Sequence, residues 1–279
     1  MIAIERYEHV DAFLAVAGGF LAAREAEHNL LLGICSTLQV RAWPFDELPD
    51  LLVVRSGPAI VLAAIRTPPY NLVLSEVDEP RALSALAGAL ADLNLPGVVG
   101  PKGHAGTFAE HWCRAAGHRP YLAIAERIFR LTAVQPPPKP TGRLRLAGPD
   151  DRAILIDWFE AFGREALPAD SPPLDSDLVD RRIAQGGIYL WDDAGPVSLA
   201  AVGARTPNGA RVGPVYTPPE LRGRGYASAC VAGASQAQLD AGLTYVFLFT
   251  DLANPTANHI YQAIGYEPVR DVDSWRFAG

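Results

Sequence analysis

The sequence of 279 residues contains few cysteines and few lysines, and it has no excess of positive charge. The three cysteines, Cys35, Cys113 and Cys230, are odd in number and widely spaced, which argues against a disulfide framework and against a zinc site. Unpaired cysteines are typical of a reducing compartment, so we expect the protein in the cytoplasm. The formal net charge of −7 is spread over both halves, whereas a nucleic-acid-binding domain carries a basic face. We therefore expect no nucleic-acid partner.

Long apolar runs and clusters of metal ligands are also lacking. No run approaches the roughly 20 apolar residues that a membrane span needs, so we expect no membrane association. The short apolar run near the start follows Glu5, Glu8 and Asp11 instead of basic residues, which predicts an amphipathic helix and not a signal peptide. His104 and His259 stand in no ligand-like spacing, and we expect no metal.

A proline-rich segment, "VQPPPKPTGR", divides the chain almost in the middle. Because it cannot continue a helix or a central strand, we predict a linker over 136–142 between domains of residues 1–135 and 143–279. Each half reads as helices, then strands of antiparallel appearance, then strand, loop, helix and strand. This order predicts a mixed α/β or α+β fold built from a diverged tandem repeat, in which 97–106 ("GVVGPKGHAG") takes the place of "VGPVYTPPELRGRG".

The stretch "LRGRGYAS", residues 221–228, has the composition of an anion-binding turn. It follows an expected strand and opens an expected helix, where unpaired backbone N–H groups and the positive end of the helix dipole meet. Gly223 and Gly225 permit backbone angles and close approaches that a Cβ blocks, and Arg222 and Arg224 add charged donors. The turn lacks the lysine of a Walker loop, and Ser228 stands where a dinucleotide fingerprint needs its third glycine. A pyrophosphate site and an ordinary solvated turn both remain open on these residues alone.

The flanking segments favour a ligand site. Pro214 lies inside the preceding strand, where it marks an edge or a bulge, and a strand broken there leaves backbone groups free. Downstream, "NPTANHIYQAIG" predicts a helix with Asn254 as its N-cap and a glycine stop. At 3.6 residues per turn, Asn254, Asn258 and Tyr261 share one stripe beside the apolar face. Polar residues in that position line a cleft or serve as a cap, a solvated amide and a half-buried tyrosine.

Residues of about 143–277 resemble the GNAT superfamily of acyl-CoA-dependent N-acyltransferases. The hallmark Arg/Gln-x-x-Gly-x-Gly/Ala is met by Arg222, Gly225 and Ala227, and the helix with its two asparagines and tyrosine follows at the family's spacing. The resemblance implies two GNAT-like domains, each a mostly antiparallel twisted sheet flanked by helices, with a splayed strand pair at the cofactor site. The first half lacks the hallmark, so it resembles a degenerate repeat without a cofactor of its own.

The resemblance also implies the cofactor, acetyl-CoA, and the residues that bind it. The implied coenzyme A contacts are Val215, Tyr216, Thr217, Arg222, Gly223, Arg224, Gly225, Tyr226, Ala227, Ser228, Asn254 and Asn258. The first three would pair with the pantetheine arm, the next seven would hold the pyrophosphate, and the asparagines would lie beside the pantetheine or the thioester. Tyr261 matches the tyrosine that acts as a general acid.

These features together predict an N-acetyltransferase that transfers an acetyl group to a primary amine of a small molecule or a protein. The general base stays open among Glu160, Glu165, Asp251 and water, and each carboxylate equally suits a solvated or capping role. Trp158, Phe159 and Phe162 are either walls of an acceptor pocket or core residues. A non-catalytic acyl-CoA-binding or regulatory module is the alternative, and an NAD-linked oxidoreductase is disfavoured by the missing glycine. The oligomeric state stays open and includes a homodimer.

Overall fold

The computed structural model describes residues 1–40, 43, 47–167 and 176–278. In the described residues the helices are α1 (Val10–Ala22), α2 (Asn29–Val40), α3 (Arg81–Ala89), α4 (His104–Ala116), α5 (Arg152–Ala166), α6 (Ser176–Ala184), α7 (Tyr226–Asp240) and α8 (Pro255–Ile264). The strands are β1 (Ile2–Tyr7), β2 (Asp50–Ser56), β3 (Ala59–Arg66), β4 (Leu72–Leu74), β5 (Gly97–Pro101), β6 (Arg119–Leu131), β7 (Arg143–Leu146), β8 (Ile188–Asp192), β9 (Pro196–Gly203), β10 (Gly209–Tyr216), β11 (Tyr245–Asp251) and β12 (Glu267–Ala278).

All of these strands belong to one sheet, which runs through both halves of the molecule. Its order is β1-β2-β3-β4-β5-β12-β6-β11-β10-β9-β8-β7, so the first five strands mirror β7 to β11 on either side of a central pair. Most neighbours are antiparallel, and the parallel pairs β4/β5 and β10/β11 occupy equivalent places in the two halves. The expected mixed fold built from two repeats is confirmed.

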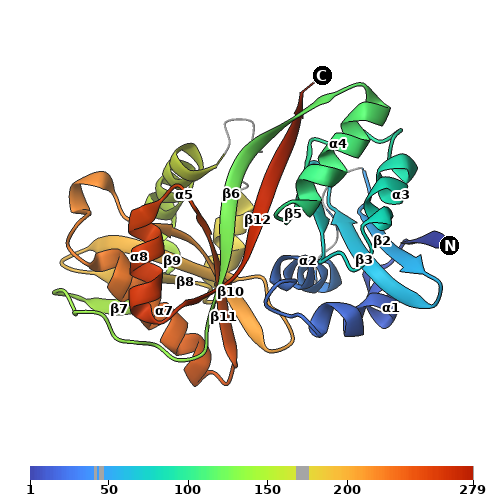
Figure 1. Cartoon of the computed structure of the whole chain (residues 1–279). Helices are drawn as coiled ribbons and strands as arrows, with labels where there is room; N and C mark the ends of the chain where they lie inside the picture. The colour runs from blue at the N-terminus through green and yellow to red at the C-terminus, as the bar shows by residue number, and fades with distance from the viewer. Residues whose placement is uncertain (41–42, 44–46, 168–175, 279) are drawn as a thin grey trace.

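The central pair exchanges the last strand of each half. β12 pairs with β5, β6 pairs with β11, and β6 and β12 pair with each other from Glu267 opposite Arg130 to Ala278 opposite Arg119. Figure 1 shows β6 and β12 standing side by side between the two groups of helices. The expected boundaries place β6 in the first domain and β12 in the second, although each strand is hydrogen-bonded to the opposite half.

The repeat is aligned differently from our expectation. The parallel pairs make β5 the counterpart of β11. Residues 97–106 therefore correspond to the end of β11 and the start of α8. The expected match of these residues to "VGPVYTPPELRGRG" is wrong. The counterpart of residues 217–225 is the segment 75–80, between β4 and α3. Its acidic residues pair with arginines, as in Glu76 with Arg270 at 2.8 Å and Asp78 with Arg24 at 2.8 Å. An acidic loop without glycine cannot attract a pyrophosphate.

Helices cover both faces of the sheet. In the second half α7 and α8 pack against Val212, Val246 and Leu248, and α5 and α6 pack on the other face against Leu199 and Ala201. In the first half α3 and α4 lie on one face and α1 and α2 on the other. The alternation of side chains along each strand therefore sorts the residues near the site into two opposite environments.

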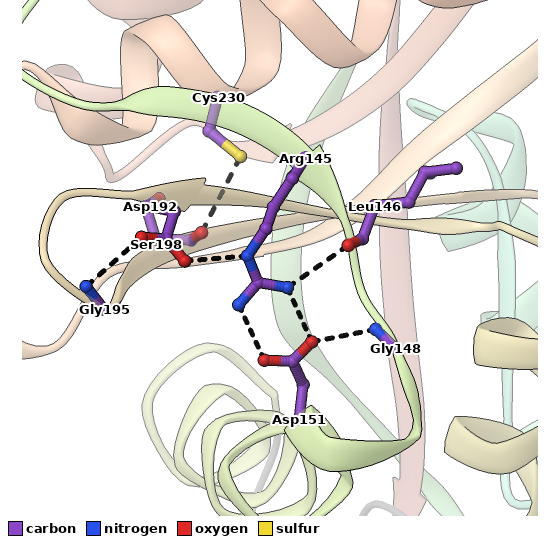
Figure 2. Close-up of polar contacts among 8 residues, drawn as sticks. All are labelled: Arg145, Leu146, Gly148, Asp151, Asp192, Gly195, Ser198 and Cys230. Atoms are coloured by element: carbon purple, nitrogen blue, oxygen red, sulfur yellow. Dashed lines mark hydrogen bonds and ion pairs between the residues drawn. The ribbon is translucent and has the colours of Figure 1, made fainter.

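A partly buried polar network fixes the start of α5 against the edge of the sheet (Figure 2). The Arg145 guanidinium on β7 donates to both carboxylate oxygens of Asp151, each at 2.7 Å, and to Asp192 at 2.7 Å. The same Asp151 carboxylate accepts the Gly148 N–H at 2.8 Å. The hydrogen bonds from Arg145, together with that from the Gly148 N–H, hold the pKa of Asp151 below its usual range, so the network stays charged at neutral pH.

The first half also docks directly on the second. The carboxylate of Glu25 accepts hydrogen bonds from the Thr206 hydroxyl at 2.5 Å and from the backbone and side chain of Asn208 at 2.8 and 2.7 Å. Gly33 on α2 lies so close to Ala204 that an added Cβ would come within 2.7 Å of the alanine Cβ. Helix α2 is thereby held beside the loop that joins β9 to β10.

Because of the strand exchange, we expect neither half to fold alone. Residues 1–135 alone leave one side of β5 and both sides of β6 unpaired, and residues 143–279 alone leave one side of β11 and both sides of β12 unpaired. Circular dichroism during heating should show no cooperative transition for either fragment, whereas the two fragments produced together should recover one. A cooperative transition of the isolated first fragment, with native helix content, would contradict this expectation.

Candidate functional site

The site begins where β10 and β11 separate. The two parallel strands are paired only from Gly209 opposite Tyr245 to Arg211 opposite Phe247, although both strands continue beyond. On its other side β10 loses register with β9 between Val212 and Val215, which confirms the bulge expected at Pro214. The end of β10 thus has backbone groups that no longer pair with β11, and we call this break in the ladder beyond Arg211 and Phe247 the gap.

The loop after β10 presents a run of free backbone donors. Gly223 and Gly225 have φ values of +77° and +81°, which an L side chain rarely adopts. The first backbone bond of α7 is the one from Ala229 N–H to the Gly225 carbonyl at 3.0 Å. Within the described residues, the N–H groups of 223–228 have no acceptor. Six consecutive donors at the positive end of a helix can hold a bound oxyanion.

The side chains of this loop act mainly as anchors. Arg222 donates to the Thr217 carbonyl at 2.8 Å and to Glu165 on α5 at 2.6 Å. Its guanidinium also lies over the Tyr216 ring, 5.7 Å from the centroid. The Arg224 guanidinium donates to the Glu220 carbonyl at 3.2 Å. Arg222 therefore clamps the loop to β10 and α5.

The start of α7 is also held in place by hydrogen bonds. The Tyr226 hydroxyl donates to Asp193 at 2.6 Å, and Thr141 donates to the same carboxylate oxygen at 2.7 Å. These two hydrogen bonds, that of Tyr226 first, lower the pKa of Asp193. The turn between β8 and β9 thus fixes where the free donors point.

On α8, the expected asparagines shape the turn that precedes the helix. The Asn254 side chain accepts the Ala257 N–H at 3.0 Å, which confirms the expected N-cap. The Asn258 amide donates to the carbonyls of Asp251 at 2.9 Å and Asn254 at 2.7 Å. Both side chains hold the backbone between β11 and α8, beside the gap in the sheet.

Tyr261, one turn further along α8, is half-buried. Its ring contacts that of Tyr266 edge to face, with centroids 6.0 Å apart, and Tyr266 is hydrogen-bonded to Ser235 on α7 at 2.8 Å. Tyr261 packs on the edge of the same core cluster as Val215 and Leu221, which flank the gap and the loop. Burial raises the pKa of Tyr261 to about 12, so its hydroxyl stays protonated at neutral pH.

The three carboxylates considered as general bases all have other contacts. Glu160 lies 3.7 Å from Arg164 on the exposed side of α5. Glu165 pairs with Arg222 and accepts a hydrogen bond from Tyr216 at 3.3 Å. Asp251 accepts the Ala253 N–H at 2.7 Å in the turn before α8.

The sequence reasoning missed charged residues on the other face of the sheet. Glu126 on β6 lies opposite Asp251 on β11, and Arg211 on β10 extends over the Phe249 ring at 5.6 Å. Arg182 on α6 lies over the Phe159 ring at 5.7 Å and donates to the Gly213 carbonyl at 3.2 Å. A glutamate inside the otherwise apolar run "YLAIAERIF" was the available signal, but no local pattern places β6 beside β11.

Comparison with known proteins identifies the family of the domain in the second half of the chain. The sequence profile of the acetyltransferase (GNAT) family matches residues 153–266. The chain contains a GNAT acetyltransferase domain. This domain spans the gap, the glycine loop and α8, which are the features described above. No curated protein matches the chain in sequence.

Solved structures show that the fold extends over both halves. A GCN5-related N-acetyltransferase from Sphaerobacter thermophilus is 18% identical with a TM-score of 0.64, covering 99% of this chain and 95% of its own. A GNAT-family acetyltransferase from Colwellia psychrerythraea is 10% identical with a TM-score of 0.60, covering 99% of each chain. A tandem GNAT protein from the clavulanic acid biosynthesis pathway is 13% identical with a TM-score of 0.57, covering 100% and 98%. At sequence identities this low, the similarity shows a shared fold and nothing further.

Among the described residues, no helix is long and apolar enough to cross a membrane, and no group of three or more potential metal ligands occurs. Cys230 on α7 is buried, and burial raises the pKa of its thiol to about 12. A thiol held in that form is a poor nucleophile, as we expected from its place in the helix.

We expect Asn258→Ala to destabilise the domain by about 1–2 kcal/mol, because it removes two hydrogen bonds that hold the turn before α8. Urea unfolding followed by fluorescence measures this change. Gln262→Ala, an exposed position on the same helix, is the control and should change stability by less than about 0.5 kcal/mol. Equal stability of the two variants would show that the turn does not depend on Asn258.

Proposed function

We propose that the GNAT domain transfers an acetyl group from acetyl-CoA to a primary amine of a small molecule or protein. The observation that carries this proposal is the run of unpaired N–H groups from Gly223 to Ser228, next to the gap between β10 and β11. The donors suit a pyrophosphate, and the gap suits a narrow chain that ends in a reactive group. The three cysteines are buried and free, which supports the expected cytoplasmic setting.

The residues present fit coenzyme A in detail. The pyrophosphate would accept hydrogen bonds from the backbone of residues 223–228, and the glycine φ values keep these donors pointing outward. The unpaired end of β10, from Val215 to Thr217, offers backbone groups to the two amides of the pantetheine arm, as an added strand would. Because Arg222 is already bound to Thr217 and Glu165, its proposed part is to hold the loop in place. Asn254 and Asn258 similarly hold the turn that borders the arm.

The proposed reaction involves an amine nucleophile, the carbonyl group of the thioester and a leaving thiolate. The lone pair of a neutral amine forms the C–N bond, and the carbonyl oxygen takes the negative charge. A backbone N–H near Val215, freed by the bulge, is the proposed donor to that oxyanion. Collapse re-forms the C=O bond and breaks the C–S bond, while nitrogen loses one proton and sulfur gains one.

Tyr261 is the proposed partner of the leaving sulfur. A thiol has a pKa of about 8.5, well below the value of about 12 to which burial raises the pKa of Tyr261. Complete proton transfer from the tyrosine to the thiolate is therefore uphill by several pKa units. The structure favours a hydrogen bond from the Tyr261 hydroxyl that stabilises charge on sulfur until a proton released by nitrogen arrives.

A thiol-release assay with acetyl-CoA and a panel of amines tests the proposed activity. Release that depends on the amine, with an acetylated product detected by mass spectrometry, is the expected result. Binding of acetyl-CoA without release on any amine would instead favour the non-catalytic acyl-CoA-binding module.

We expect Tyr261→Phe to lower kcat about 100-fold and to leave the affinity for coenzyme A nearly unchanged, because the hydroxyl acts only as sulfur departs. Steady-state kinetics and calorimetric titration of coenzyme A measure the two quantities. Tyr266→Phe is the matched control, since it removes a neighbouring buried hydroxyl that is bonded to Ser235, and it should keep kcat within a few-fold. An unchanged kcat in Tyr261→Phe would remove this residue from the mechanism.

We expect Gly225→Val to abolish coenzyme A binding, because a valine does not tolerate a φ of +81° and the loop must change shape. Gly242→Val is the control for strain, since Gly242 has a φ of +92° in the exposed turn after α7, away from the loop. Both variants should lose about 1–3 kcal/mol of stability, and only the first should lose binding in the titration. Retention of coenzyme A affinity by Gly225→Val would contradict the pyrophosphate site.

A further inference from the structure

We propose that the acceptor is a small amine that also carries a carboxylate, which Arg211 and Arg182 bind while Glu126 holds and deprotonates its amino group. This inference rests on the proposed acetyltransferase activity and specifies its substrate class. It also names Glu126 as the base in place of Glu160, Glu165 and Asp251, each of which already has another contact.

The strand register places these groups together on one face of the sheet. Ala210 and Val212 belong to the core beneath α7 and α8, so Arg211 between them points to the opposite face. Phe247, Phe249 and Asp251 on β11 share that face, and Asp251 lies directly opposite Glu126 on β6. Arg211 is the last residue of β10 that still pairs with β11. The charged cluster therefore starts where the gap in the sheet starts.

The charges of the cluster have no hydrogen-bonded counter-ion, although Arg211 and Glu126 attract each other. Among the described residues Glu126 has neither a hydrogen bond nor an ion pair, and the only contact found for the Arg211 guanidinium is the Phe249 ring. Arg182 has one backbone acceptor and the Phe159 ring. Half-buried charges without partners are destabilising, and a ligand with charges of the opposite sign would offset that cost.

The electrostatics of the cluster suit a zwitterion. Burial raises the pKa of Glu126 to about 7, with Arg211 opposing the rise and Asp251 adding to it. Burial, then the charges of Arg211 and Arg181, lower the pKa of Arg182 to about 10. Two guanidinium groups that repel each other attract a carboxylate, and their planar donors match its two oxygens. A carboxylate side chain with a pKa near 7 is suited to accept a proton at neutral pH.

The walls of the cluster favour a small acceptor. Phe159 from α5 and Phe249 from the sheet border it, and α2 of the first half covers the neighbouring part of the same face. Under α2 a cavity of about 20 Å³, lined by Leu30, Ile128 and Phe249 among others, has room for no more than a water molecule. We therefore place the acceptor beside Arg211 and Arg182, next to the gap, and not under α2.

The proposed step balances as follows. Glu126 takes one proton from the acceptor ammonium, and the freed lone pair attacks the thioester carbon as in the mechanism above. The second proton that nitrogen loses on collapse goes to the departing sulfur, and the proton on Glu126 passes to solvent. The net products are the N-acetylated acid, free coenzyme A and one proton.

The test compares amino acids with their amides. Glycine, β-alanine, 4-aminobutyrate, 6-aminohexanoate and the proteinogenic amino acids, each beside its carboxamide, are assayed by thiol release with acetyl-CoA. We expect the best acid to exceed its carboxamide in kcat/KM by at least about tenfold. Arg211→Gln should bring the ratio of kcat/KM between acid and carboxamide close to one and leave the KM for acetyl-CoA unchanged. Arg143→Gln, on the far edge strand, is the control and should keep the ratio of the parent protein.

Glu126→Gln should lower kcat about 100-fold on both members of a pair, and Glu126→Asp should recover part of the loss. Because neither side chain makes a hydrogen bond or an ion pair within the described residues, Glu126→Gln and Arg211→Gln should melt at the same temperature as the parent or higher. A carboxamide preferred over its acid, or a ratio unchanged in Arg211→Gln, overturns the inference and leaves the acetyltransferase activity standing. Absence of thiol release with every amine overturns the proposed function itself.

Discussion

The pairing of β6 with β12 is the interaction on which the rest of the structure depends. It joins two repeats into one sheet, and it places a strand from each half in the ladder of the other. Since β11 pairs with β6, the strand that borders the gap is held from one side by the first half of the chain. The gap can stay open on the β10 side because β11 needs no support from β10 beyond Arg211. Strand exchange and cofactor access are therefore linked.

The two halves share a topology and differ in the charge of one loop. After β10 the chain carries two glycines at positive φ and two arginines, and the N–H groups there are free. After β4 the equivalent segment carries carboxylates that are neutralised by arginines such as Arg24 and Arg270. An acidic loop repels a pyrophosphate, so a single cofactor site follows from the same fold used twice. The first half instead covers one side of the site and contributes strands to the shared sheet.

Local features of the site could be predicted from the sequence because they depend on neighbouring residues. The bulge at Pro214 and the cap at Asn254 follow from short-range backbone rules, and the structure contains both. The alignment of the repeats failed because glycines at 97–106 imitate a turn whose true counterpart is acidic. Glu126 was missed for a different reason, since it enters the site only through pairing with residues more than a hundred positions away. No periodicity within β6 encodes its partner.

The gap between β10 and β11 would let residues on opposite faces of the sheet take part in the proposed reaction. Tyr261 lies on the face covered by α7 and α8, and Glu126 lies on the face of α2, α5 and α6. In an intact sheet these side chains would be separated by a layer of hydrogen-bonded backbone. Where the strands part, a thioester can be reached from one face by the group that assists departure and from the other by the attacking amine. A proton donor and a proton acceptor kept on separate faces do not neutralise each other, so each keeps the protonation state that its step requires.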